Sequence, residues 1–416
     1  MPTLSVLIDA QLMQLPCKLA LEWPGGRAGT SAAPVRLKLH DSRMLASLVR
    51  GQIGHLADAY VRGLVDIEGS LTDVMGVAAH LAGDPVRQSN QRAWPRWLQR
   101  ARSRHLHRRD RDAAAVQSHY DLCDDFFALW LDPLRVYSCA YYRETDFSLS
   151  QAQEAKLDHV CAKLQLAPGL RFLDVGAGWG GLLLWAAEHY GVQALGITLS
   201  KNQHDYVNRL IKARGLSGQV EMRLIDYREL PESACFDRIA SIGMFEHVGD
   251  GHLSAYFAKL RRLLKPGGLV LNHGITAGGL RHGQLGAGIG DYIEKHIFPG
   301  GELVHVARVC ESLAEGGLEL LDLENLRPHY ARTLWDWSAG LERQLERARE
   351  LTDDSRVRAY RMYLAGSAMS FERGWLSLNQ FLATRQDGDV QSGRLPGAQS
   401  AYPFNRQHMY VEGALP

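Results

Sequence analysis

The sequence predicts an α/β fold: a doubly wound, mainly parallel sheet with helices on both faces, preceded by a smaller α+β domain. From residue 170 to about 385, short apolar runs alternate with helical patterns, which is typical of parallel sheets. A glycine-rich stretch follows the first of these runs, at the end of a strand where such sheets bind ligands. Near the amino terminus, residues 35–39 instead alternate between apolar and basic, and helical patterns follow at 42–49 and 55–62.

A chain of 416 residues is longer than one average domain, so we expect more than one folded unit. We place the small α+β domain at 1–85, a basic linker at 86–115, the larger domain at 116–385 and an irregular tail at 386–416. No apolar run is long enough to span a bilayer, and the first residues lack the basic region of a signal peptide. We therefore expect a cytoplasmic protein.

The six cysteines are scattered and include no C-x-x-C pair: Cys17, Cys123, Cys139, Cys161, Cys235 and Cys310. In a chain that is not exported, this pattern predicts reduced thiols and neither a disulfide framework nor a metal site.

Positive charge is concentrated in the linker. Nine arginines and one aspartate between Arg87 and Arg111 give a local balance of +8, whereas the whole chain has a net charge of +1. Arginines recur every fourth residue from 96 to 108 beside Trp94 and Trp97, so a helix here would suit an anionic membrane surface. The alternatives are a solvated linker helix and a nucleic-acid contact. One short basic stretch on a nearly neutral chain supports the last only weakly, and we expect no nucleic-acid partner.

The elements of the larger domain follow in order. The expected strands are 171–175, 192–198, 220–225, 238–242, 269–275 and 318–323. The expected helices are 180–190, one ending near 214, and 252–264, which the Lys-Pro-Gly-Gly run at 265–268 stops.

The loop from Asp174 to Gly181 reads D-V-G-A-G-W-G-G, in which glycines permit a tight turn and close approach to a ligand. This spacing also satisfies the dinucleotide fingerprint. A nicotinamide enzyme, however, needs an acidic residue at the end of the second strand, where this chain has Thr198-Leu199-Ser200. The loop instead resembles the first motif of S-adenosylmethionine-dependent methyltransferases, in which Asp226, after the third strand, suits the adenine amino group.

Further polar clusters follow the strands or precede the domain: Tyr137-Ser138-Cys139, 242–247, 272–275 and 328–330. A single cysteine or histidine is more often structural than functional. Together with His119-Tyr120-Asp121, 199–203 and 298–301, however, these segments resemble the cyclopropane-fatty-acyl-phospholipid synthases and the mycolic acid cyclopropane synthases. The resemblance covers about 115–385, and the first domain more weakly resembles that of the phospholipid-acting members.

The resemblance implies a Rossmann-like class I methyltransferase domain and a reaction at an alkene. The alkene attacks the sulfonium methyl, and a base then removes a proton from the new methyl so that the ring closes. In the family this base is thought to be bicarbonate. The residues that would hold it are Cys139, Glu246, His273, Ile275 and Tyr330. Histidine and tyrosine can donate to an anion, and Glu246 can share a proton with it.

The resemblance also implies a cofactor site. Its residues are Tyr137, Ser138, Asp174, Gly176, Gly178, Thr198, Leu199, Gln203, Asp226, Tyr227 and Ile242. The Tyr137 ring would attract the sulfonium through a cation–π contact.

The resemblance implies an enzyme that cyclopropanates membrane phospholipid and forms a homodimer. Together with the basic segment it predicts a peripheral enzyme on the inner face of the membrane. Three alternatives remain open: methyl transfer to the same alkene, N-methylation of a small amine, and a non-enzymatic lipid-binding module. The last would require missing loop or site residues, and none is missing.

Overall fold

The computed structural model describes residues 8–9, 12–87, 124–232, 236–280, 284–387 and 406–409. The basic segment around 94–108, for which a membrane contact was one of three hypotheses, the motif at 119–121 and most of the tail lie outside these residues. Within the described ranges, no helix is both long and apolar enough to cross a membrane. The cysteines described in the structure, Cys17, Cys139, Cys161 and Cys310, are free thiols, and no cluster of metal-binding side chains occurs among the described residues.

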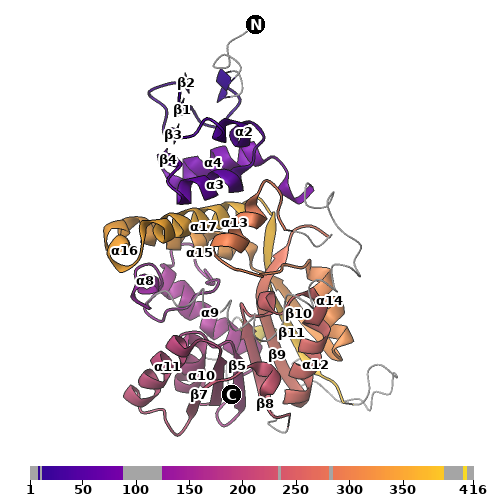
Figure 1. Ribbon diagram of the computed structural model, residues 1–416. Helices are drawn as coiled ribbons and strands as arrows, with labels where there is room; N and C mark the ends of the chain where they lie inside the picture. The colour runs from indigo at the N-terminus through magenta and orange to yellow at the C-terminus, as the bar shows by residue number, and fades with distance from the viewer. Residues whose placement is uncertain are drawn as a thin grey trace.

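The amino-terminal domain is built on a four-stranded sheet with the order β2-β1-β3-β4 (Figure 1). Its strands are β1 (Leu19–Trp23), β2 (Gly26–Gly29), β3 (Val35–Leu39) and β4 (Val65–Glu68). Its helices are α2 (Met44–Val49), α3 (Ile53–Val61) and α4 (Leu71–Ala82). The predicted alternation in β3 is confirmed, because Val35, Leu37 and Leu39 are buried while the two basic residues between them are exposed.

The larger sheet has seven strands in the order β10-β11-β9-β8-β5-β6-β7. They are β5 (Arg171–Val175), β6 (Gln193–Thr198), β7 (Val220–Leu224), β8 (Phe236–Ile242), β9 (Leu264–Ala277), β10 (Leu318–Asn325) and β11 (Leu376–Arg385). β5 to β9 pair in parallel, and β11 is antiparallel to both its neighbours. The predicted doubly wound, mainly parallel sheet is confirmed.

Helices cover both faces of this sheet. α9 (Leu149–Lys163), α10 (Gly181–Tyr190) and α11 (Lys201–Ala213) share one hydrophobic core with the sheet. α12 (Leu253–Leu263) and α14 (Val306–Glu315) share a second core with the opposite face. Phe172 and Leu173 are consecutive residues of β5, and each points into a different one of these two cores. This is expected because successive side chains of a strand point to opposite faces of the sheet.

One predicted boundary differs. The run at 265–268 was expected to end a helix and separate it from the next strand, but β9 already begins at Leu264, which pairs with Phe236. The register shifts immediately afterwards, between Phe236 and Arg238. Gly267 has φ +76°, a conformation available to glycine, so the run forms an irregularity within the strand instead of a loop.

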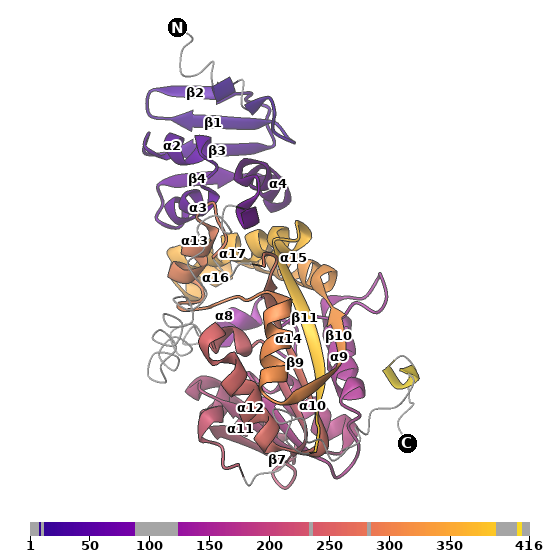
Figure 2. The same ribbon diagram turned by 90° about the vertical axis from the view of Figure 1, so that its right-hand side faces the viewer.

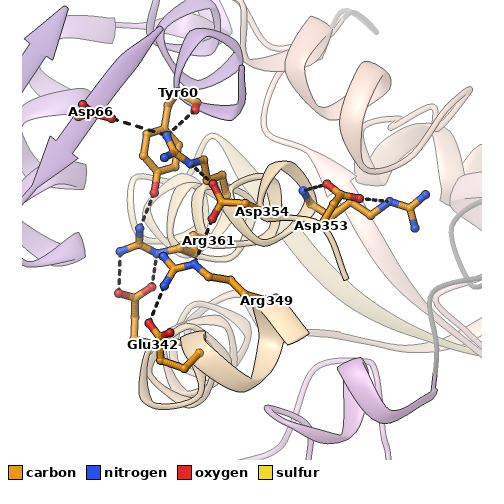
Figure 3. A network of polar contacts seen from close by, with 10 residues as sticks. Tyr60, Asp66, Glu342, Arg349, Asp353, Asp354 and Arg361 are labelled. Atoms are coloured by element: carbon orange, nitrogen blue, oxygen red, sulfur yellow. Dashed lines mark hydrogen bonds and ion pairs between the residues drawn. The ribbon is translucent and has the colours of Figure 1, made fainter. Parts of the chain in front are cut away.

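A helical layer lies between the two sheets (Figure 2). It contains α13 (Ile289–His296), α15 (Arg327–Arg343), α16 (Leu345–Leu351) and α17 (Asp354–Glu372). A polar network joins this layer to the amino-terminal domain (Figure 3). Arg361 forms a two-pronged ion pair with Glu342 and donates to the Tyr60 hydroxyl, while Arg358 donates to the Tyr60 carbonyl oxygen. The small domain is therefore docked on α17 by directed contacts.

Candidate active site

The glycine loop turns sharply between β5 and α10. The amides of Gly176 and Ala177 both donate to the Ile197 carbonyl oxygen, at 3.0 and 2.9 Å, which fastens the loop to the end of β6. Gly176 and Gly178 have φ of +79° and +56°, which strongly favour glycine. The loop thus exposes backbone at the carboxyl edge of the sheet, where ligands of such folds bind.

The ends of β6 and β7 form the second wall of this site. The Thr198 hydroxyl donates to the Gln203 side chain at 2.9 Å, and Ser200 caps α11 by accepting the Gln203 amide. Asp226, predicted to face the adenine, accepts both the amide and the guanidinium of Arg228. Its carboxylate is therefore held in place, with Arg228 as a neighbour that the sequence did not reveal.

Helix α9 holds the segment that runs past the loop. The Gln153 amide donates to the Val136 and Ser138 carbonyl oxygens at 3.2 and 2.8 Å, and Lys156 donates to the Ser138 hydroxyl at 3.0 Å. Burial, partly offset by the Asp132 charge, lowers the pKa of Lys156 to about 8. Burial likewise raises the pKa of Asp174 to about 7, against the opposing charge of Lys156. This buried lysine is a site residue that the sequence analysis missed.

Two cavities adjoin at this point. The smaller, about 390 Å³, is lined by all eleven residues predicted for the cofactor. The larger, about 1240 Å³, is lined by all five residues predicted for the anion and extends between the two domains. Tyr137, Ser138, Gly243 and His247 line both cavities. The structure therefore brings both predicted sets together around one junction.

Glu246 lies at this junction in a short 3-10 turn after β8. Its Oε1 accepts the Ile275 amide at 2.7 Å, whereas its Oε2 is buried without a hydrogen-bond partner in the described structure. Burial raises the pKa of Glu246 to about 7. The Ile275 amide, predicted to face an anion directly, is thus engaged in holding Glu246.

His273 lies on β9, immediately before Gly274, and, like Glu246, is buried. Its Nδ1 accepts from the Gln380 amide nitrogen at 3.2 Å, across the pairing of β9 with β11. Burial, reinforced by the nearby charges of Lys156 and Lys163, lowers the pKa of His273 to about 3, so the ring is neutral at physiological pH. With Nδ1 as acceptor, the ring proton lies on Nε2, a buried atom without a partner among the described residues.

Cys139 and Tyr330 complete the predicted set. The Cys139 thiol donates to the Ala140 carbonyl oxygen at 3.1 Å, and burial raises its pKa far above the usual value, so it is a neutral thiol and not a nucleophile. Its segment is tied to α15, because the Ala140 amide donates to the Thr333 hydroxyl. Tyr330, in the first turns of α15, is buried against Phe371.

Tyr137 lies within an aromatic cluster that the sequence did not reveal. Its ring centroid is 5.5 Å from that of Phe127, 5.4 Å from that of Trp130 and 5.3 Å from that of Trp337. Phe127 and Trp130 lie within ten positions of Tyr137, whereas Trp337 comes from α15, about 200 residues further along the chain, and only the fold brings it to the cluster. The faces of such rings attract cations.

Comparisons with known proteins agree with this geometry. The family model described as mycolic acid cyclopropane synthetase matches residues 107–381. A probable fatty acid methyltransferase from Pseudomonas putida is 39% identical over 401 residues, which are 96% of this chain and 98% of that protein. Cyclopropane mycolic acid synthase 1 from Mycobacterium tuberculosis is 40% identical over 276 residues, 64% of this chain and 96% of its own length.

A solved structure is also similar. The mycolic acid cyclopropane synthase CmaA1, complexed with SAH and CTAB, has a TM-score of 0.62 and 38% identity, covering 66% of this chain and 98% of its own. The region that the family model matches, 107–381, contains the residues of the larger domain that line the two cavities. The amino-terminal domain lies outside this region.

Proposed function

Since this chain belongs to the mycolic acid cyclopropane synthetase family of S-adenosylmethionine-dependent enzymes, we propose that it converts a double bond in an unsaturated phospholipid acyl chain to a cyclopropane ring. The observation that carries the proposal is the junction of the two cavities. A site lined by the cofactor residues opens onto a large, mainly apolar cavity lined by Glu246, His273 and Cys139. Pockets for ordinary small ligands rarely exceed about 1,000 Å³, so the larger cavity suits a long chain.

The residues around the junction fit a small oxyanion such as bicarbonate. The His273 Nε2–H is a buried donor without a partner in the described structure, and the Glu246 Oε2 is a buried oxygen in the same situation. Buried polar groups in folded proteins are usually hydrogen-bonded, so two such atoms that line one cavity support the binding of a small polar ligand between them. With a pKa of about 7, Glu246 exchanges between a protonated form that can donate to the oxyanion and a carboxylate that can take a proton from it. Tyr330 and Cys139 add further polar atoms to the same wall.

When bound, S-adenosylmethionine would supply an electrophilic methyl, and bicarbonate would supply a base for the proton that must leave. Overall, the acyl chain gains one CH2, the cofactor leaves as S-adenosylhomocysteine, and one proton is released. The chain's residues orient and protect these events. Tyr137 lines both cavities and can stabilise positive charge at their junction, while Trp130 and Trp337 pack around its ring.

The surroundings also protect a carbocation from capture. Cys139 is a neutral thiol and Lys156 already donates to Ser138, so neither is free to attack. The cavity is lined mainly by apolar residues, which limits the water near the junction. Glu246 exchanges a proton at its unpartnered oxygen while the Ile275 amide fixes the other oxygen.

The test uses purified protein, S-adenosylmethionine and vesicles of mono-unsaturated phospholipid, followed by proton NMR of the recovered lipid. High-field cyclopropane signals are expected with the wild type and should fall at least a hundredfold in Glu246→Gln, roughly the loss of a general acid–base group. The matched control is Glu350→Gln, which alters an exposed pair on α16. Absence of any lipid modification by the wild type would refute the proposal.

Methyl transfer to the same alkene is the second candidate. It is favoured by the full-length relative named a probable fatty acid methyltransferase. Both reactions add CH2, so mass alone does not separate them. Methyl-branched chains without high-field ring signals would establish this alternative.

A further inference from the structure

The larger cavity has a polar corner that the proposed chemistry does not use. On the amino-terminal domain it is lined by Ser47, Arg50, Gln52 and His55. None of these four side chains has an intramolecular hydrogen bond or ion pair within the described structure. Arg50 is, in addition, the only lysine or arginine that lines the cavity in the described part of the chain.

A short turn between α2 and α3 holds these side chains together. The Gln52 amide donates to the Ser47 carbonyl oxygen at 2.9 Å, and the His55 amide donates to the Gln52 carbonyl oxygen at 3.1 Å. Gly51 has φ +63°, and a β-carbon there would lie 2.0 Å from the Leu81 carbonyl oxygen, so the turn requires glycine.

The turn is docked on the catalytic domain where the cavity opens. The Gly54 amide donates to the Ala287 carbonyl oxygen at 3.0 Å, and a β-carbon on Gly54 would lie 1.8 Å from the Gly288 carbonyl oxygen. Arg50 and His55 are exposed, whereas apolar lining residues deeper in the cavity, such as Val35, are fully buried. The polar corner is therefore the solvent-facing mouth of an apolar cavity.

We propose that this mouth binds the phosphodiester of a glycerophospholipid whose acyl chain occupies the cavity; this inference rests on the proposed function. A guanidinium beside hydroxyl, amide and imidazole groups matches the oxygens of a phosphate. Five carboxylates of the described residues line the same cavity. Asp250 is paired with Arg308, Glu294 accepts from Gln284, and Glu302 accepts the Asp250 amide. Glu246 belongs to the junction of the two cavities. Asp291 lies in the first turn of α13, where the helix dipole favours its charge.

Direct binding tests the site independently of catalysis. Isothermal titration would use monomeric dihexanoyl-phosphatidylglycerol and, separately, inorganic phosphate. Arg50→Ala is expected to weaken binding of the phospholipid roughly tenfold to a hundredfold, the range for a charged hydrogen-bonding group. Arg27→Ala is the matched control, an exposed arginine of the same domain that does not line the cavity. Equal affinities of wild type and Arg50→Ala, or no binding by the wild type, would overturn the inference.

Two further arms identify the source of the phosphate and separate this inference from the proposed function. Arg50→Glu should raise KM for phospholipid vesicles, whereas kcat at saturating phospholipid and the affinity for SAH, which binds in the other cavity, should stay unchanged. If the wild type modifies phospholipid and Arg50→Glu does so equally well, the inference fails and the proposed function stands. If inorganic phosphate binds at Arg50 but the phospholipid does not, the site is for free phosphate and the lipid assignment is wrong.

Discussion

Glu246 and His273 share one buried junction, and burial moves their pKa values in opposite directions. Both groups become neutral there, because burial disfavours the charged form of each. A neutral His273 donates to an anion without taking its proton, while Glu246 stays close to its own titration point. The pair therefore separates the tasks of holding an anion and exchanging a proton.

The first prediction concerns the pH dependence of turnover. With its pKa raised to about 7, Glu246 becomes ionised as pH rises through 7, so a step that needs its carboxylate should slow about tenfold per unit below that value. Initial rates from pH 5.5 to 8.5 on phospholipid vesicles measure this. In Glu246→Gln the acidic limb should disappear from the residual rate, and an unchanged limb would assign it to another group.

The same shift predicts an effect on stability. The unfolded chain ionises near the model value of 4.5, before the folded protein does at about 7, so the wild type loses stability as pH rises through this window. In Glu246→Gln, the glutamine side-chain oxygen can still accept the hydrogen bond from the Ile275 amide. Glu246→Gln should therefore gain stability relative to wild type, on the order of 1–3 kcal/mol at pH 8, but not at pH 4. Urea unfolding at both pH values would show it, and equal shifts would contradict the assignment.

Lys156 is the third residue whose role can be isolated. It donates to Ser138 and is the charge that opposes the raised pKa of Asp174. Lys156→Met removes both effects, so the affinity for SAH should fall about tenfold, as for loss of a charged hydrogen bond. Isothermal titration with SAH measures this. The control is Lys201→Met, which removes an exposed lysine at the start of α11. Unchanged affinity would make Lys156 structural only.

At the scale of elements, α9 connects helix formation to the site. Its first turn carries a complete capping box between Ser148 and Gln151, and its later turns carry Gln153 and Lys156. Ser148→Ala should lower the free energy of unfolding by about 1 kcal/mol. Urea unfolding tests this against Ser148→Thr, which keeps the cap. Affinity for SAH should stay within twofold of the wild-type value, because Gln153 and Lys156, which reach the site, lie in later turns of the helix than the cap.

Elements were predictable where burial and polarity agree. The apolar run of β5 and the alternation of β3 identify both strands directly. β11 was not predicted because buried polar residues interrupt its buried apolar residues: Asn379 donates to Thr276, and Thr384 donates to the Gly268 carbonyl oxygen. Polarity normally indicates exposure, and only tertiary hydrogen bonds reverse that rule.

The site shows the same division. Residues carried by motifs, such as Glu246 and the glycine loop, were found from the sequence, and the structure gathers them around two cavities. Lys156 and Gln380 were missed, since a lysine on a helix usually indicates a solvated face and a lone glutamine indicates nothing. Their importance arises from contacts between distant segments, which no local pattern encodes.

At the scale of the whole molecule, the amino-terminal domain is part of the cavity and not an appendage. Apolar residues of β3, β4 and α4 line the same space as the catalytic residues, so loosening the domain should open the cavity to water. Arg361 is central to the docking, because it joins Tyr60 of α3 to Glu342 of α15 (Figure 3).

Arg361→Ala should therefore lower phospholipid turnover at least tenfold while leaving SAH affinity unchanged, since none of the small domain's described residues lines the cofactor cavity. Hydrogen exchange at α3 and α4 should become faster in this variant, because partly buried charged hydrogen bonds of about 1.5–3 kcal/mol are lost. Arg347→Ala removes only an exposed pair on α16 and should change neither quantity. If Arg361→Ala accelerated exchange but kept full turnover, the reaction would not depend on the docked domain. If turnover fell without faster exchange, Arg361 would act locally on the helical layer, and the amino-terminal wall of the cavity would have to be probed through its own residues.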